Sequence, residues 1–350
     1  MAADGNQIGA FNELLDRYER QLLDSFLRAI EDLKTEAEVQ KVIRLLEAGD
    51  INGAIVALHL DEAAFNPLVS AIAQAYEAGG QHGAWSLPKR SPSGDRLAIR
   101  FDGLNPRAQQ WLRDHSTQLV TRILEDQRQA IRGELLGGLQ RGENPRVTTL
   151  NIVGRINRAT GRRDGGIIGL TSAQAAAVQK ARGELGSTDP ADLQRYLGRG
   201  RRDKRFDRTV AKAMREGGKV PLEIAQRAGD RYADRLLQLR GEMLARTEAL
   251  TSLHAGQYQA LLQSVDNGAV RADQLRRTWR SAGDGRVRHT HRGLNGDSVG
   301  LTEAFTSPSG ARMRFPGDTS LGAPGDEVIG CRCVVTARVD WLSNLLGRAA

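Results

Sequence analysis

Two pairs of side chains near the end of the chain are the residue types most able to do chemistry. His289 and His291 lie two positions apart, and so do Cys331 and Cys333. Thiolate and imidazole groups suit a tetrahedral zinc site, although structural sites usually leave roughly two to four residues between cysteines. A Cys–His pair can also serve as nucleophile and base, but the spacing supplies no orienting third residue. Buried thiols and a hydrogen-bonded histidine that stabilise a loop-rich module are the interpretation favoured here.

A second chemical signal is a dense positive run in the middle of the chain. Asp203 and Asp207 interrupt this run, so a solvated and partly paired helix face is the simplest interpretation. The formal net charge of +8 favours affinity for phosphates without specifying a fold. The alternative is contact with the phosphate backbone of nucleic acid through Arg199, Arg201, Arg202, Lys204 and Arg205.

The glycine-rich sequence RRDGGIIGLT does not predict a phosphate-binding loop. Leu170 and Thr171 stand where a Lys-Ser/Thr pair would follow the last glycine of such a loop. We expect a turn that leads into a helix capped by Thr171.

Composition and periodicity predict a mainly helical chain. Hydrophobic residues make up 40% of the 350 residues and aromatic residues only 5%, which favours helical packing over a broad β-sandwich. Apolar residues recur at three and four positions from Ile8 to Leu33, and Asn105-Pro106 is typical of a helix start. A long helical pattern covers 221–264, whereas the glycines and prolines of 79–95 predict a helix stop and a mobile linker. No stretch approaches the ~20 apolar residues of a membrane span.

The character of the chain changes after Asp273, where short β-prone pieces replace helical periodicity. These pieces lie around 274–280, 298–301, 313–315 and 333–339. We predict a mainly α fold, with an elongated helical body and a small C-terminal α+β module. Its parts would be an N-terminal helical segment (1–85), a helical middle region ending in a long helix (96–264) and the module (265–342).

An ordered set of unlike residues in the last third of the chain resembles the phage Mu F-like minor head proteins, also called phage head-morphogenesis proteins. The resemblance is specific over about 237–339 and looser upstream, and Gly330 stands where the family usually has Asn. The residues that carry it are Ala245-Arg246-Thr247-Glu248, Trp279, Arg286-Val287-Arg288, His291, Leu294, Gly296, Phe305, Pro316-Gly317-Asp318, Glu327 and Cys331-Arg332-Cys333.

This resemblance implies a bacteriophage minor capsid protein that is associated with the portal or the inner head. It would act in head morphogenesis, DNA packaging or genome delivery by DNA ejection, with the portal protein, other head proteins and packaged double-stranded DNA as partners. It would lie in the virion, at the head interior or portal vertex, and in the host cytoplasm during assembly. No catalytic residues are expected. The alternatives are a hydrolase that uses Cys331 and His291, and a non-specific DNA-binding protein.

The resemblance also implies a structural centre for the C-terminal module. Arg246 and Glu248 would anchor the long helix to the module by ion pairs. His291, Cys331 and Cys333 would form its polar group, with Asp318 nearby, and zinc is the one cofactor expected if this group binds a metal. The full set is Arg246, Glu248, Trp279, Arg288, His291, Gly296, Pro316, Asp318, Cys331 and Cys333.

Overall fold

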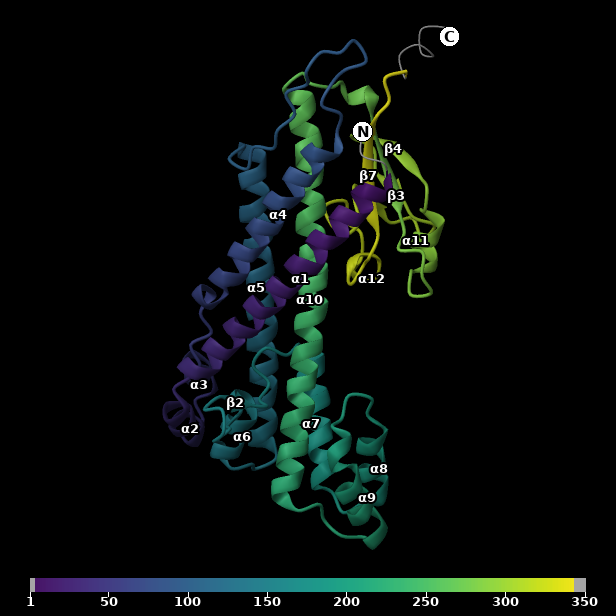
Figure 1. Ribbon diagram of the computed structural model, residues 1–350. Helices are drawn as coiled ribbons and strands as arrows, with labels where there is room; N and C mark the ends of the chain where they lie inside the picture. The colour runs from purple at the N-terminus through teal and green to yellow at the C-terminus, as the bar shows by residue number, and fades with distance from the viewer. Residues whose placement is uncertain (1–3, 343–350) are drawn as a thin grey trace. The chain divides into compact units, whose positions relative to one another are not determined.

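The chain folds mainly as α-helices, with small antiparallel sheets towards its C-terminal end (Figure 1). The computed structural model describes residues 4–342. Helices make up 62% of the structure. The predicted mainly α fold with a small C-terminal α+β part is therefore confirmed. No helix in the described range is both long and apolar enough to cross a membrane.

The chain divides into two compact units, each built from separated segments. One unit contains Met1–Ser25, Pro67–Thr117 and Glu242–Ala350, and the other contains Phe26–Asn66 and Gln118–Gly241. Three long helices contribute residues to both units: α1 (Asp4–Glu36), α5 (Pro106–Gln140) and α10 (Leu222–Asp266). The predicted segments 1–85, 96–264 and 265–342 do not follow these units, and they stay a prediction about the sequence.

In the unit that holds the C-terminal part, α4 (Asn66–Ser86) continues through the glycines where a linker was expected. A Cβ atom on Gly79 would lie 2.0 Å from the Leu253 carbonyl oxygen, and one on Gly256 would lie 1.9 Å from the Tyr76 carbonyl oxygen. These glycines thus allow the backbones of α4 and α10 to approach closely. The predicted helix stop at Gly79 is wrong because packing, rather than a turn, requires glycine there.

The C-terminal part of this unit is built on a three-stranded antiparallel sheet in the order β4-β3-β7. Its strands are β3 (Leu275–Arg280), β4 (Ser298–Gly300) and β7 (Val334–Val339), and β5 (Phe305–Thr306) pairs separately with β6 (Arg312–Met313). Two short helices, α11 (His289–Gly293) and α12 (Gly325–Val328), lie in the connections. The predicted pieces 274–280, 298–301 and 333–339 are confirmed, and 313–315 overlaps β6 only at Met313; the strand at Phe305 was not predicted.

Side chains from α1 and α10 cover the free edge of β7. The Gln7 amide donates to the Ala337 carbonyl and accepts from the Ala337 N–H, both at 3.1 Å. His254 Nε2 accepts from the Val335 N–H at 3.2 Å, and Gln257 donates to the Val335 carbonyl at 3.0 Å. These contacts satisfy the backbone groups that an exposed edge strand would leave unpaired.

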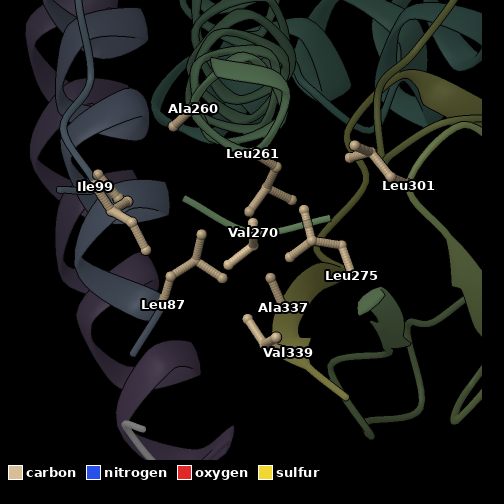
Figure 2. Packing of buried hydrophobic residues seen from close by; sticks show 10 residues of the cluster. Leu87, Ile99, Ala260, Leu261, Val270, Leu275, Leu301, Ala337 and Val339 are labelled. Atoms are coloured by element: carbon tan, nitrogen blue, oxygen red, sulfur yellow. The ribbon is translucent and has the colours of Figure 1, made fainter. Parts of the chain in front are cut away.

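One hydrophobic cluster joins the end of α4, the following loop, the end of α10 and the sheet (Figure 2). Figure 2 shows side chains from these segments pointing toward a shared centre. Burial of this apolar surface is the main force that attaches the small sheet to the helices of its unit. The cluster consists of Ala84, Leu87, Ile99, Ala260, Leu261, Val270, Leu275, Leu301, Ala337 and Val339.

The second unit contains shorter helices around its segments of the long ones. They are α2 (Val39–Glu47), α3 (Ile51–Val56), α6 (Pro145–Val153), α7 (Ser172–Gly186), α8 (Pro190–Gly198) and α9 (Asp207–Glu216). The expected start of α7 is confirmed, since the Thr171 side chain accepts from the Gln174 N–H in a capping box. A two-stranded hairpin, β1 (Arg155–Ile156) with β2 (Arg163–Asp164), follows α6.

The glycine-rich sequence RRDGGIIGLT begins in this hairpin and continues as the predicted turn into α7. Helix side chains hold its backbone at Gly165. Gly165 has a φ of +72°, which favours glycine. Lys34 of α1 donates to the Gly165 carbonyl at 2.7 Å, and Asp234 of α10 accepts from the Gly165 N–H at 2.7 Å. Burial lowers the pKa of Lys34, and nearby carboxylates oppose that shift. The Gly165 backbone groups therefore bind protein side chains rather than a phosphate.

Candidate functional site

The structure brings together the three residues expected to form the polar group. His291 comes from α11, while Cys331 and Cys333 lie directly before β7. His291 Nδ1 lies 3.4 Å from Cys331 Sγ and 3.5 Å from Cys333 Sγ. All three side chains are at most 2% exposed. The Cys333 N–H also lies 3.5 Å from Cys331 Sγ, so the one-residue gap brings both sulfurs against one histidine.

A carboxylate that sequence reasoning did not place in this group completes it. Glu327 Oε2 lies 2.9 Å from His291 Nε2, at ion-pair distance, although Nε2 makes no hydrogen bond of good geometry. Glu327 also accepts hydrogen bonds from Thr290 and Ser309. Burial acts to raise the pKa of Glu327, but these hydrogen bonds and the neighbouring His291 give a net lowering. The carboxylate is therefore ionised at neutral pH and lies beside the imidazole. The one signal in the sequence that pointed to Glu327 was its place among the residues that carry the family resemblance.

Asp318, which was expected near this group, has a local structural role instead. Its carboxylate accepts from the Arg314 N–H at 2.8 Å and from the Ser320 N–H at 2.9 Å. These bonds fix the turn that contains the buried Pro316 and Gly317, whose φ is +92°. Asp318 is thus part of the structural centre but not of the Cys/His group.

The two thiols are free and differ in their acidity. A hydrogen bond with the Cys333 thiol is the largest influence that lowers the pKa of Cys331; burial opposes it, and His291 lowers the pKa further. The pKa of Cys333 is raised, because its proton is shared with Cys331 and because the group is buried. One negative charge is therefore stabilised beside the imidazole.

The space beside these side chains is small. A cavity of about 10 Å³ adjoins His291, Cys331 and Cys333, and Arg288 and Arg332 also line it. That is about the space that one water molecule occupies. Cys331, His291 and Glu327 have the order of nucleophile, base and orienting carboxylate, but a cavity of this size does not admit an organic substrate. A metal ion needs no larger opening.

The remaining predicted residues of the module pack around the same group. Trp279 meets His291 edge to face, with ring centroids 5.2 Å apart, and packs in the same way on Phe305. The Gly296 N–H donates to the Trp279 carbonyl at 2.9 Å, and Arg288 donates to the Ile329 carbonyl. These contacts attach the loops at Gly296 and Ile329 to the structured part of the module.

Arg246 and Glu248 were predicted to anchor α10 to the module. In the structure they anchor it to other helices instead. Arg246 pairs with Glu19 of α1 at 2.7 Å, and Glu248 pairs with His115 of α5 at 2.6 Å. Residues two positions apart on a helix point about 200° away from each other, which explains why Arg246 and Glu248 reach different helices.

Contact between α10 and the module comes instead from positions four and three residues apart on another face of the helix. The Gly330 N–H donates to Thr247 Oγ1 at 3.0 Å, and Thr251 Oγ1 donates to the Gly317 carbonyl at 3.3 Å. His254, on the same stripe, bonds to β7. The prediction of ion-pair anchoring is therefore wrong, because neutral threonines and a histidine make these contacts.

Carboxylates neutralise much of the predicted basic run in the second unit. Arg199 binds Glu184 through two hydrogen bonds, Arg202 binds Asp207 in the same way, and Arg205 binds Asp203 at 2.6 Å. Arg201 and Lys204 are exposed and have no ion pair within the range 4–342. The run is consequently less positive than its sequence indicates.

An open groove in the same unit collects positive charge that no run in the sequence revealed. It has a volume of about 620 Å³ and its lining includes Lys41, Arg44, Arg146, Arg155 and Arg163. Lys41 pairs with Glu38 and Arg155 with Asp230, and Arg163 donates to the Gly154 carbonyl at 3.2 Å. Arg44 and Arg146 are exposed and make no ion pair with any described residue.

Comparison with known proteins supports the resemblance seen in the sequence. Residues 194–336 match the family model described as Phage Mu protein F like protein. No curated protein and no solved structure shows significant similarity to the chain. Through residues 194–336, the chain is therefore similar to the phage Mu F-like proteins. The matched region runs from α8 to β7 and contains the whole Cys/His group.

Proposed function

We propose that the chain is a minor head protein that binds the portal protein and other head proteins without catalysing a reaction. The observation that best supports this function is the match over 194–336. The burial of His291 and Cys331 and the small cavity beside them favour a structural role for the Cys/His group over hydrolysis. The protein would lie in the virion, at the portal vertex or in the head interior, and would act in assembly, packaging or DNA ejection.

Co-expression with the portal protein of the same phage tests this function. The complex would be examined by size-exclusion chromatography and native mass spectrometry, at a salt concentration high enough to screen exposed charges. We expect the chain to migrate with the portal ring at a fixed stoichiometry. A chain that remains monomeric beside an intact ring would contradict the proposal.

We also propose that the basic groove contacts the DNA backbone. Arg44 and Arg146 lie on this groove without carboxylate partners, whereas three of the five residues first expected to contact DNA are paired. Unpaired cations at an exposed surface can release counterions from DNA, whereas paired ones contribute less. The contact would be with phosphates and would not depend on base sequence.

Binding to a short DNA duplex at several salt concentrations tests the groove. Replacing both Arg44 and Arg146 by Ala should reduce the slope of log affinity against log salt by about 2, because each phosphate contact contributes about 0.9. The matched control replaces Arg122 and Arg128 by Ala, which removes the same charge from exposed positions of α5 outside the groove. Equal losses in the two double variants would show that general charge, rather than the groove, causes binding.

A further inference from the structure

We propose that His291, Cys331 and Cys333 bind one zinc ion, with Glu327 as the carboxylate that supports the histidine. The ion would link α11 to the segment before β7 and stabilise the loop-rich module. This inference concerns the site itself and does not rest on the proposed head function.

The spacing of the ligand atoms fits tetrahedral zinc. Zinc binds sulfur at about 2.3 Å and imidazole nitrogen at about 2.0–2.1 Å, so a tetrahedron places sulfur and nitrogen about 3.6 Å apart. The observed distances from His291 Nδ1 are 3.4 Å to Cys331 Sγ and 3.5 Å to Cys333 Sγ. All three ligand atoms lie within 4.8 Å of one another. An ion can therefore bind with only small shifts of these side chains.

Hydrogen bonding alone explains this arrangement less well. A neutral imidazole nitrogen has either one lone pair or one proton, so Nδ1 makes one strong hydrogen bond. Here two sulfur atoms lie at nearly equal distances from that nitrogen. Two soft ligand atoms and one nitrogen around a shared centre are the arrangement that zinc requires.

Glu327 supplies the outer contact that metal-binding histidines usually have. Its carboxylate lies 2.9 Å from Nε2, so a proton on Nε2 would leave the Nδ1 lone pair free for a metal. Ser309 and Thr290 hold this carboxylate in place. The outer contact and the ligand atoms therefore lie on opposite sides of the same ring.

Charge and space at the site also suit the ion. Binding of Zn²⁺ would displace the proton that Cys331 and Cys333 share, and the two resulting thiolates would balance the charge of the ion. The cavity of about 10 Å³ can hold one water molecule as the fourth ligand. The site would thus be closed to larger ligands, as expected for a structural ion.

The direct test is the metal content of the full chain. Protein purified without metal-affinity steps would be analysed for zinc, then stripped and reloaded with Co²⁺ for absorption spectroscopy. We expect about one zinc per chain, as for a structural site, and intense cobalt bands typical of tetrahedral thiolate coordination. A wild-type chain that holds no zinc and develops no thiolate-to-cobalt band would overturn the proposal, whatever the variants do.

Single substitutions identify the ligands. Cys331→Ser, Cys333→Ser and His291→Gln should each lower zinc content well below one per chain and reduce the melting temperature. His289→Gln is the matched control, because His289 is exposed on the same short helix. It should retain zinc and the cobalt bands. Equal zinc loss in His289→Gln and His291→Gln, or an unchanged melting curve on removing zinc from the wild type, would contradict the assigned ligands or the structural role.

Discussion

The close approach of α4 and α10 makes Gly256→Ala an informative substitution. A Cβ atom at this position would lie 1.9 Å from the Tyr76 carbonyl oxygen and 2.7 Å from the Gly80 nitrogen. Both are backbone atoms, so neither can rotate away as a flexible side chain would. The helices must separate to admit one methyl group.

The expected effect combines two opposing terms. Alanine in place of glycine favours a helix by about 1 kcal/mol, whereas overpacking a tight contact costs roughly 1–3 kcal/mol. The upper value applies here because the clash is with backbone. The net destabilisation is therefore about 2 kcal/mol, which lowers the melting temperature by about 4–8 °C for a folding unit of roughly 150–250 residues.

Gly133→Ala in α5 is the matched control. Gly133 is exposed, and a Cβ atom there meets nothing within 4 Å. The same chemical change should then stabilise the chain by about 0.5–1 kcal/mol. Thermal unfolding followed by circular dichroism measures both variants. If Gly256→Ala raises the melting temperature as much as Gly133→Ala, the argument from helix contact is refuted.

Three further predictions concern the same unit. Glu327→Gln should retain zinc at saturation but weaken its binding about 10–100-fold, measured by competition with a chelator; unchanged affinity would exclude an orienting role. Burial lowers the pKa of His254 to about 3 from an ordinary value of 6.5, so the unfolded chain protonates first as the pH falls below 6.5. The wild type should therefore lose about 2 kcal/mol of stability between about pH 7 and pH 5, and His254→Gln should lose less; equal losses would show that His254 is not the group responsible. A double-mutant cycle of Arg246→Met and Glu19→Gln should give a coupling of about 1 kcal/mol in urea unfolding, and additive effects would contradict their ion pair.

Local signals in the sequence predicted elements well where the cause lies within a few residues. Asn105 before Pro106 and the capping box at Thr171 start helices because their side chains satisfy nearby N–H groups. The β-prone pieces were recognised for a similar reason, since helical periodicity ends where they begin and two of them pair as β3 and β7. Such features need no knowledge of distant segments.

Features that depend on distant partners could not be read from the sequence. Gly79 has the same appearance as a helix stop, and only its contact with Leu253 shows that it lies inside a helix. Likewise, Arg199 belongs to a basic run, but Glu184 neutralises it from another helix. The Cys/His group was found because it consists of rare residue types, whereas Glu327 was passed over because carboxylates are common on any surface.

Quantitative mass spectrometry of purified proheads and virions tests the central claim most directly. A minor head protein should be present in both, at far fewer copies than the major capsid subunit and in a fixed ratio to the portal protein. A chain that is expressed during infection but absent from both particles would contradict the account.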